Sequence, residues 1–466
     1  MVRVHPTALR LVPVGTSGES SWRAPITAPG PRGGEMLSAI RPIRRNPLEF
    51  LATTWRRHGD VVQFPIPRPA TYLISGPSDV RSILVSGAKT QSKRTLQYDN
   101  LATVTGNGLL TADDPPWREH RRVVQPAFHH GELAGVVDHT FEALGPWLTR
   151  WRNAGPEVID LDEVMMEVSL QVVASALFGS DWQANAAGLT KSTIVALDAV
   201  VARARNPLAP PLWLPTPGNR RLKSATAALD AAVDAVLDER ARGQAVQGDL
   251  VDLLIAGLRR ENGSVDRSAV RDELVTFLVA GHETVASALT WAWYQLAKHP
   301  DVADELAAEA QQSLADGRPG LSDVSGLILS RAVVDETLRL YPPAWVITRK
   351  LTQETQLADY CLPAAALVIM SPWIVQRHAD VWSQPDAFRP HRFVGVDARG
   401  QAGYLPFGLG PRICVGRDFA LTEAVIVLSV LAREFRFELT DAGAITPLAS
   451  VTLRPPEGLA VRVSRR

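Results

Sequence analysis

The sequence predicts a mainly α-helical fold with small β-sheets, and three observations lead to this prediction. Stretches rich in Ala, Leu and Glu recur with helical periodicity between about residues 115 and 435. A proline-free and largely apolar stretch, from residue 266 to about residue 298, is typical of one long buried helix of roughly 50 Å. Short apolar runs in the first and last quarters of the chain predict a few strands.

The N-terminal part of the chain is expected to change from irregular to ordered structure near residue 46. Residues 1–45 are rich in Pro, Gly and Arg, which predicts an irregular segment. Asn46 followed by Pro47 is typical of a helix start. The apolar runs at residues 61–64 and 71–74 then predict a pair of short strands.

The C-terminal third combines strands with a long coil. The run at residues 367–370 predicts a late strand. Residues 371–413 hold many prolines and glycines, which predicts a long packed coil of the kind that is often functional. Because no linker interrupts the helical part, we expect one domain over residues 46–466 that follows the irregular segment 1–45.

Composition and charge exclude several classes of protein. Lys plus Arg and Asp plus Glu each number 49, and a net charge of zero argues against a nucleic-acid binder that depends on phosphate contacts. Cys361 and Cys414 are too few for a disulfide framework or a cysteine-rich metal cluster. The N-terminus shows neither a membrane anchor nor a secretory signal, so we expect a cytoplasmic protein.

The loop at residues 407–416, which reads FGLGPRICVG, carries the strongest chemical signal. Its glycines permit tight turns with positive φ, and Pro411 stiffens it. A helix-compatible run begins at Asp418, so backbone N–H groups and the positive helix end would stabilise a thiolate at Cys414. A thiolate with an open face above it suits haem iron, whereas a plain glycine turn with a buried cysteine is the alternative.

A second signal lies in the middle of the long helix, where residues 280–284 read AGHET. Gly281 weakens the helix by about 1 kcal/mol relative to alanine, and the Thr284 hydroxyl can bond the Ala280 carbonyl. A loosened turn would leave a groove for dioxygen and water, and Glu283 beside it could exchange protons with solvent. We expect His282 to be a structural neighbour rather than an iron ligand.

Together these segments resemble the cytochrome P450 family. The loop matches the family signature F-x-x-G-x-R-x-C-x-G at every fixed position, and residues 280–284 match A-G-x-[DE]-T. The resemblance covers about residues 46–460, with five motifs in the family order. It implies the cytochrome P450 fold with the long helix over the haem, haem b as cofactor, Cys414 as the iron ligand, and Thr284 with Glu283 as the catalytic pair.

The resemblance also assigns a structural network. Glu336 and Arg339 match the family's E-x-x-R helix, and Arg392 lies in its later arginine motif. We expect these three side chains to form a buried network that locks the coil carrying Cys414, at high cost if broken. Taken alone, Glu336 and Arg339 would read as an ordinary surface ion pair.

Further residues are assigned to the cofactor and to the substrate pocket. The positions that match propionate ligands are Trp117, Arg121, Arg349 and Arg412, with His120 as an alternative donor and solvated arginines as the plain alternative. The other expected haem contacts are Ala280, Phe407 and Gly416. The expected pocket residues are Leu109, Val279, Ala280, Trp345 and Val346, where Trp345 either shapes the pocket or packs in the core.

These assignments predict a monooxygenase that inserts one oxygen atom of dioxygen into a hydrophobic molecule, by hydroxylation or epoxidation. Because the pocket residues are mostly apolar, a fatty acid, a terpene or a steroid-like molecule is expected. Electrons would come from a separate ferredoxin or flavodoxin with its NAD(P)H reductase, steered by a basic patch at Arg118, Arg121, Arg122 and Arg417. An isomerase or dehydratase using the same haem, and a non-enzymatic haem carrier or sensor, are the alternatives.

Overall fold

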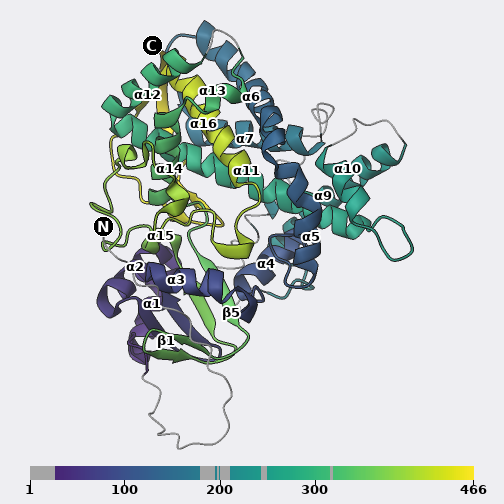
Figure 1. The fold of residues 1–466 in the computed structure, drawn as a ribbon, viewed down its shortest axis with the longest axis vertical. Helices are drawn as coiled ribbons and strands as arrows, with labels where there is room; N and C mark the ends of the chain where they lie inside the picture. The colour runs from purple at the N-terminus through teal and green to yellow at the C-terminus, as the bar shows by residue number, and fades with distance from the viewer. Residues whose placement is uncertain (1–26, 179–194, 197–198, 200–209, 243–248, 315–317) are drawn as a thin grey trace, which may run out of the picture. The chain divides into compact units, whose positions relative to one another are not determined.

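The computed structural model describes residues 27–178, 195–196, 199, 210–242, 249–314 and 318–466. The chain divides into two compact units (Figure 1). The smaller unit comprises Met1–Thr95, Ala344–Ala387 and Ala398–Cys414, and the larger one comprises Leu96–Pro343, Phe388–Asp397 and Val415–Arg466.

The smaller unit is built around a five-stranded sheet with the strand order β1-β2-β8-β5-β3. Val61 lies opposite Ile74 in the antiparallel pair β1–β2, so the predicted strand pair is confirmed, and the predicted late strand is β8. The strands of this unit are β1 (Val61–Pro67), β2 (Ala70–Ile74), β3 (Gln91–Ser92), β5 (Ile347–Leu351), β6 (Thr355–Leu357), β7 (Tyr360–Leu362) and β8 (Leu367–Met370). Its α-helices are α1 (Gly33–Arg45), α2 (Pro47–His58), α3 (Pro77–Arg81) and α15 (Pro372–Val375).

Helix α1 corrects one expectation, because an irregular segment was predicted up to residue 45. The Glu35 carboxylate accepts the backbone N–H of Arg32 at 2.6 Å, which satisfies a donor at the helix start. Arg44 and Arg45 lie in the last turn, where positive charge favours the helix dipole. These local signals outweigh the content of Gly and Pro. Residues 1–26 lie outside the described residues, and the boundary at residue 46 stays a prediction.

The larger unit is mainly helical, with two small sheets of order β4-β12-β9 and β10-β11. Its helices are α4 (Leu96–Thr105), α5 (Pro116–Val124), α6 (Leu133–Asn153), α7 (Leu161–Phe178), α9 (Pro217–Ala241), α10 (Leu250–Gly257), α11 (Arg267–Lys298), α12 (Pro300–Ser313), α13 (Leu321–Val324), α14 (Ile328–Leu340) and α16 (Arg417–Glu434). Its strands are β4 (Glu157–Asp160), β9 (Phe435–Leu439), β10 (Leu448–Ala449), β11 (Leu453–Arg454) and β12 (Ala460–Arg465). In the described part of the chain, no helix has the length and apolar character needed to span a membrane.

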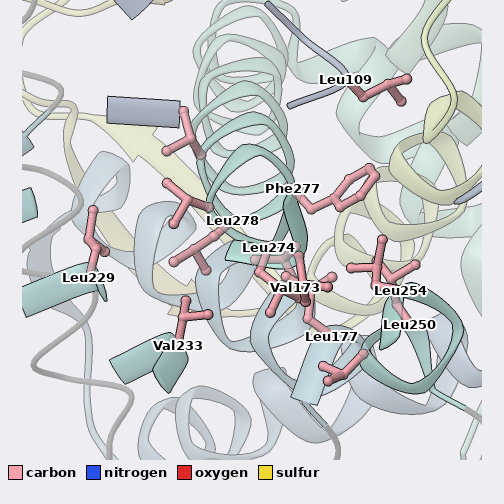
Figure 2. Packing of buried hydrophobic residues seen from close by; sticks show 14 of the residues in the cluster. Leu109, Val173, Leu177, Leu229, Val233, Leu250, Leu254, Leu274, Phe277 and Leu278 are labelled. Atoms are coloured by element: carbon pink, nitrogen blue, oxygen red, sulfur yellow. The ribbon is translucent and has the colours of Figure 1, made fainter. Parts of the chain in front are cut away.

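Helix α11 is the predicted long helix, and its 32 residues correspond to about 48 Å. The Asp266 side chain caps its start by accepting the Ala269 N–H at 3.2 Å, and Pro300 opens the next helix just beyond its end. Buried side chains of α7, α9 and α10 gather around α11 at Leu274 and Leu278 (Figure 2). This apolar cluster explains why α11 lacks the polar face of a surface helix.

Gly281 allows α11 to approach α7 closely. A Cβ atom at this position would lie 2.7 Å from Cγ2 of Val173, which is closer than real Cβ atoms come. From the sequence, Gly281 was predicted to lower the stability of the helix at this turn. The structure adds a packing reason, since a larger residue would push the two helices apart.

Helix α16 carries a carboxyl group that should make stability depend on pH. Burial raises the pKa of Glu423 from its ordinary value of 4.5 to about 8, and Ser169 opposes part of the shift. Between these pH values the unfolded chain has lost the proton that the native protein keeps, so the free energy of unfolding falls as pH rises.

Relative to Glu423→Gln, the wild-type protein should therefore lose on the order of 2 kcal/mol of stability between about pH 6 and about pH 8. Denaturant unfolding at both pH values measures this difference. The exposed Glu438, changed to Gln, serves as the control that should leave the pH dependence unaltered. Parallel pH profiles for the wild type and Glu423→Gln would contradict the prediction.

Candidate functional site

The loop before helix α16 holds Cys414 by its backbone. The Cys414 N–H donates to the Phe407 carbonyl at 2.9 Å, which closes the loop. Gly408 and Gly410 both have φ of 73°, the left-handed region that glycine favours. A Cβ atom on Gly410 would lie 2.2 Å from the Leu84 carbonyl oxygen. Both turns of the loop therefore depend on glycine, and the second also depends on close packing.

The two cysteines lie in contrasting environments and form no disulfide. Cys414 is exposed at the end of its loop, although cysteine is among the residues most often buried. Cys361 lies in β7, where burial and then Glu354 raise the pKa of its thiol to about 11. Because only a thiolate is a good metal ligand, the surroundings of Cys361 oppose that role.

The turn of α11 that was expected to manage protons has the predicted polar contact. The Thr284 hydroxyl donates to the Ala280 carbonyl oxygen at 2.6 Å. The helix continues through this turn without a break, so the groove expected there stays a prediction. His282, in the same turn, is fully buried, and burial followed by the charge of Arg454 lowers its pKa to about 4. His282 is therefore neutral near pH 7.

Glu283 lies in a different environment from the expected one. Its side chain is buried, and its Oε1 accepts the hydroxyl of Thr452 at 2.8 Å. Glu283 is therefore less exposed than expected, and its exchange of protons with solvent stays a prediction. Nothing in the sequence marks Thr452, which lies in the loop between β10 and β11, as a partner of α11.

The structure brings Glu336, Arg339 and Arg392 together. Arg339 donates to both carboxylate oxygens of Glu336, at 2.7 and 2.9 Å, and the two side chains are fully buried. Arg392 Nε donates to Glu336 Oε1 at 3.2 Å, and the backbone N–H of Arg389 does so at 2.8 Å. The plain alternative of a surface ion pair does not apply. The network ties α14 to the 3₁₀ turn Pro390–Phe393.

Helix α5 places two predicted cofactor residues beside an open hollow of about 500 Å³. Trp117 is buried and Arg121 is half-buried, one helical turn apart. The residues that line the hollow are Trp117, Arg118, Arg121, Arg122, Gln125, Pro126 and His129. Three guanidinium groups in this wall make it suitable for anionic groups.

His120, the alternative propionate donor, lies against α11. Its Nδ1 is 2.6 Å from Oε1 of the fully buried Glu273, so only Nε2 would be left for a propionate. The hydrogen bond with Glu273 raises the pKa of His120 although burial opposes the shift. Burial raises the pKa of Glu273, whereas His120 and the backbone N–H of Leu109 oppose that shift. Glu273 was not among the predicted residues, and it is the last of three consecutive charged residues that begin at Arg271.

The smaller unit holds the remaining predicted residues around its sheet. Arg349 is buried in β5, and its guanidinium donates to the Thr348 carbonyl at 2.8 Å. Trp345 is half-buried against a cluster that includes Phe64 and Ile374, which supports its packing role. The other predicted residues here, Val346, Phe407 and Arg412, are half-buried. In the larger unit, Leu109 and Val279 belong to the same buried apolar cluster, and Gly416 caps α16.

Comparisons with known proteins identify the family. A family model described as cytochrome P450 matches residues 25–462. Cyclooctat-9-en-7-ol 5-monooxygenase of Streptomyces melanosporofaciens is 33% identical over 88% of this chain and 89% of the relative, and pentalenene oxygenase of Streptomyces avermitilis is 29% identical over 94% and 97%. The crystal structure of CYP175A1 from Thermus thermophilus has a TM-score of 0.75 and 32% identity, covering 92% of this chain and 98% of that one.

The chain therefore belongs to the cytochrome P450 family, and it is a monooxygenase. The predicted fold, mainly helical with small sheets, is confirmed. Membership implies a haem iron with a thiolate ligand, dioxygen, a substrate and a redox partner. Each unit, taken by itself, has residues of a kind that fits such a group: the smaller unit has the exposed Cys414 at the end of its glycine-containing loop, and the larger unit has a hollow lined by three arginines.

Proposed function

We propose that this cytochrome P450 hydroxylates or epoxidises a terpene-like hydrophobic molecule. The observation that carries the proposal is the pair of relatives, similar over nearly their whole length, whose names specify cyclooctat-9-en-7-ol and pentalenene as what they oxidise. The predicted pocket residues agree with this substrate class. Leu109 and Val279 are buried apolar residues, and an apolar pocket favours a molecule with few polar groups.

We further propose that the cofactor is haem b and that Cys414 is its iron ligand. Haem iron with a thiolate ligand supplies the activation of dioxygen. Cys414 is exposed, and its loop makes turns with positive φ at Gly408 and Gly410 and is closed by the bond from the Cys414 N–H to the Phe407 carbonyl. Phe407, Ala280 and Gly416 are proposed as further haem contacts.

For the haem propionates we propose the donors Trp117, Arg121, Arg349 and Arg412, with Nε2 of His120 as an alternative. Trp117 and Arg121 line the basic hollow beside α5, which supports an anionic occupant. Arg349 is buried, and a buried guanidinium has a strong need for acceptors. We assign the network of Glu336, Arg339 and Arg392 to folding alone, as the lock on the coil that leads to Cys414.

For proton delivery we propose Thr284 and Glu283. The Thr284 hydroxyl donates to the Ala280 carbonyl and keeps its lone pairs to accept a hydrogen bond from a water. Glu283 supplies the acid, and Thr452 holds its carboxylate in place. Because Glu283 is buried, a proton from solvent would reach it through a local opening or a chain of waters.

An optical titration of the purified ferric protein tests the substrate class. Pentalenene, other cyclic terpenes, fatty acids and steroids are added in turn, and the Soret band is followed. A shift toward the high-spin form with terpenes, followed by oxygenated products in turnover, is the expected result. A shift with fatty acids or steroids only would overturn the terpene assignment.

Changing Thr284 to Ala should separate oxygen use from product formation. The variant keeps the haem and still consumes reducing equivalents, but product formation falls about 10²-fold because the hydroxyl that passes protons is lost. Hydrogen peroxide should account for the missing product. Thr284→Ser, which keeps the hydroxyl, is the matched control and should stay close to the wild type.

The same variant discriminates the alternatives. An isomerase or dehydratase does not consume electrons, and a haem carrier or sensor forms no product, so neither would respond to Thr284→Ala in this way. Full coupling of oxygen use to product in the variant would contradict the assignment of Thr284.

We propose a separate ferredoxin or flavodoxin, with its NAD(P)H reductase, as electron donor to this enzyme in the cytoplasm. Arg118 and Arg122 are exposed on α5, where they can attract an acidic partner. Reversing both to Glu should slow reduction by a ferredoxin about tenfold at low salt and much less at high salt. Reversing the exposed Arg462 on β12 is the control, and equal rates for all three proteins would contradict the proposed patch.

A further inference from the structure

One turn near the start of α11 is bonded to a loop from another part of the larger unit. Arg271 Nη1 donates to the Val104 carbonyl at 2.8 Å, and Asp272 Oδ2 accepts the Asn107 N–H at 2.7 Å. Two consecutive side chains of α11 therefore bond backbone groups of Val104, in the last turn of α4, and of Asn107, just beyond that helix.

The loop also packs on α11 more closely than any side chain would allow. Gly106 has φ of 62°, and a Cβ atom on it would lie 2.0 Å from Asp272 Oδ1. A Cβ atom on Gly108 would lie 2.2 Å from Thr276 Oγ1 and 2.6 Å from the Asp272 carbonyl oxygen. Since contacts this short do not occur, a side chain at either position would require the loop or the helix to shift.

The same turn of α11 is itself anchored by two other helices. Arg271 Nε donates to Asp230 of α9 at 2.6 Å, and Glu273 is bonded to His120 of α5 at 2.6 Å. These contacts restrict the side chains that hold the loop, so less conformational entropy is lost when each bond forms. The loop is thus held by a prearranged set of groups rather than by mobile surface side chains.

Leu109 gives this contact a functional meaning. It lies two residues beyond Asn107, it is buried, and it belongs to the apolar cluster that contains Phe277 and Val279 of α11 (Figure 2). Leu109 and Val279 are both proposed pocket residues. Any movement of the loop away from α11 would move Leu109 with it.

We propose that Asp272 is a positioning residue that clasps residues 106–109 against α11 and so sets the size of the substrate pocket at Leu109. The inference rests on the proposed function in one respect, which is the assignment of Leu109 to the pocket. Asp272 itself is not among the residues proposed to touch the substrate or the haem. It acts on specificity through the loop.

Two variants test the clasp from opposite sides. Asp272→Ala removes the acceptor of the Asn107 N–H, and Asp234→Ala is its control because Asp234 is an exposed partner of Arg267 on α11. Gly108→Ala forces the loop away from Thr276, and Gly145→Ala in α6, where a Cβ atom meets nothing within 4 Å, is its control.

Hydrogen–deuterium exchange of the holoprotein is the first readout. Amide exchange in residues 106–112 should be about tenfold faster in Asp272→Ala and Gly108→Ala than in the wild type. Exchange in α14 and α16 should not change, which separates a local release from general destabilisation. Unchanged exchange in residues 106–112 would overturn the clasp.

The second readout is the binding of two iron ligands of different size, imidazole and 4-phenylimidazole. Their Kd values are measured from the shift of the Soret band. 4-Phenylimidazole extends into the pocket and should change its Kd about fivefold or more in both variants, whereas the Kd of imidazole should stay within about twofold. Faster exchange with an unchanged ratio of the two Kd values would overturn the link to the pocket. If neither compound moves the Soret band of the wild type, the proposed haem site is wrong, and the pocket role of the clasp is wrong with it.

Discussion

Replacing Cys414 with Ser should abolish monooxygenase activity, with a loss on the order of 10³-fold or more. A serine hydroxyl stays protonated near neutral pH and cannot act as the anionic ligand that pushes electron density to the iron. The reduced carbonyl complex should also lose the Soret position that thiolate ligation gives. Optical spectra and product assays on the reconstituted variant measure both effects.

Cys361 provides the matched control, because the chain has only these two cysteines. The same change at Cys361 should leave the carbonyl spectrum and the turnover close to those of the wild type, since burial keeps its thiol protonated. A normal spectrum for Cys414→Ser together with a lost one for Cys361→Ser would reverse the assignment of the ligand.

Replacing Glu336 with Gln should cost about 3–5 kcal/mol of stability. Arg339 has no exposed surface, and the change would remove the carboxylate that balances its buried charge. Arg392 and the backbone N–H of Arg389 would lose their charged acceptor at the same time. Denaturant unfolding and the haem content of the purified protein measure the effect.

Glu305→Gln is the control for this experiment. Glu305 also accepts from the 3₁₀ turn Pro390–Phe393, through His391 at 2.9 Å, but both side chains are largely exposed. An exposed pair contributes about 1 kcal/mol or less, so this variant should unfold close to the wild type. Equal losses of unfolding free energy in the two variants would show that burial does not make the Glu336 network more stabilising than an exposed ion pair. If Glu336→Gln does not fold at all, the milder Arg392→Lys should still show an intermediate loss.

The features that could be predicted from the sequence are those that depend on residues close together in the chain. The proline-free apolar sequence of α11 forms one continuous stretch, and the E-x-x-R pair of α14 and the contact from Thr284 to Ala280 join residues three or four positions apart. The fold class followed from these stretches. Helix α1 was missed because a high content of Gly and Pro was given more weight than the acidic first turn and the basic last turn.

The missed contacts join residues far apart in the sequence. Thr452 reaches Glu283 only because the loop between β10 and β11 packs against α11, and His120 reaches Glu273 only because α5 does. No local sequence pattern indicates such pairs, because each partner alone is an ordinary polar residue. Glu273 ends the charged run Arg271–Glu273 and so looks like part of an exposed helix face, and Thr452 stands in no recognisable motif.

The packing of Gly410 against Leu84 has a consequence for biosynthesis. The turn before Cys414 packs at Gly410 against the backbone carbonyl of Leu84, so closely that a side chain at Gly410 would not fit. A ribosome delivers Leu84 long before the cysteine loop emerges. The contact between Leu84 and Gly410 can therefore form only after more than three hundred further residues have been synthesised. Contacts between residues so far apart in the sequence form slowly. We expect nascent chains that end before residue 410 to need protection from aggregation, because the surface around Leu84 is then still uncovered.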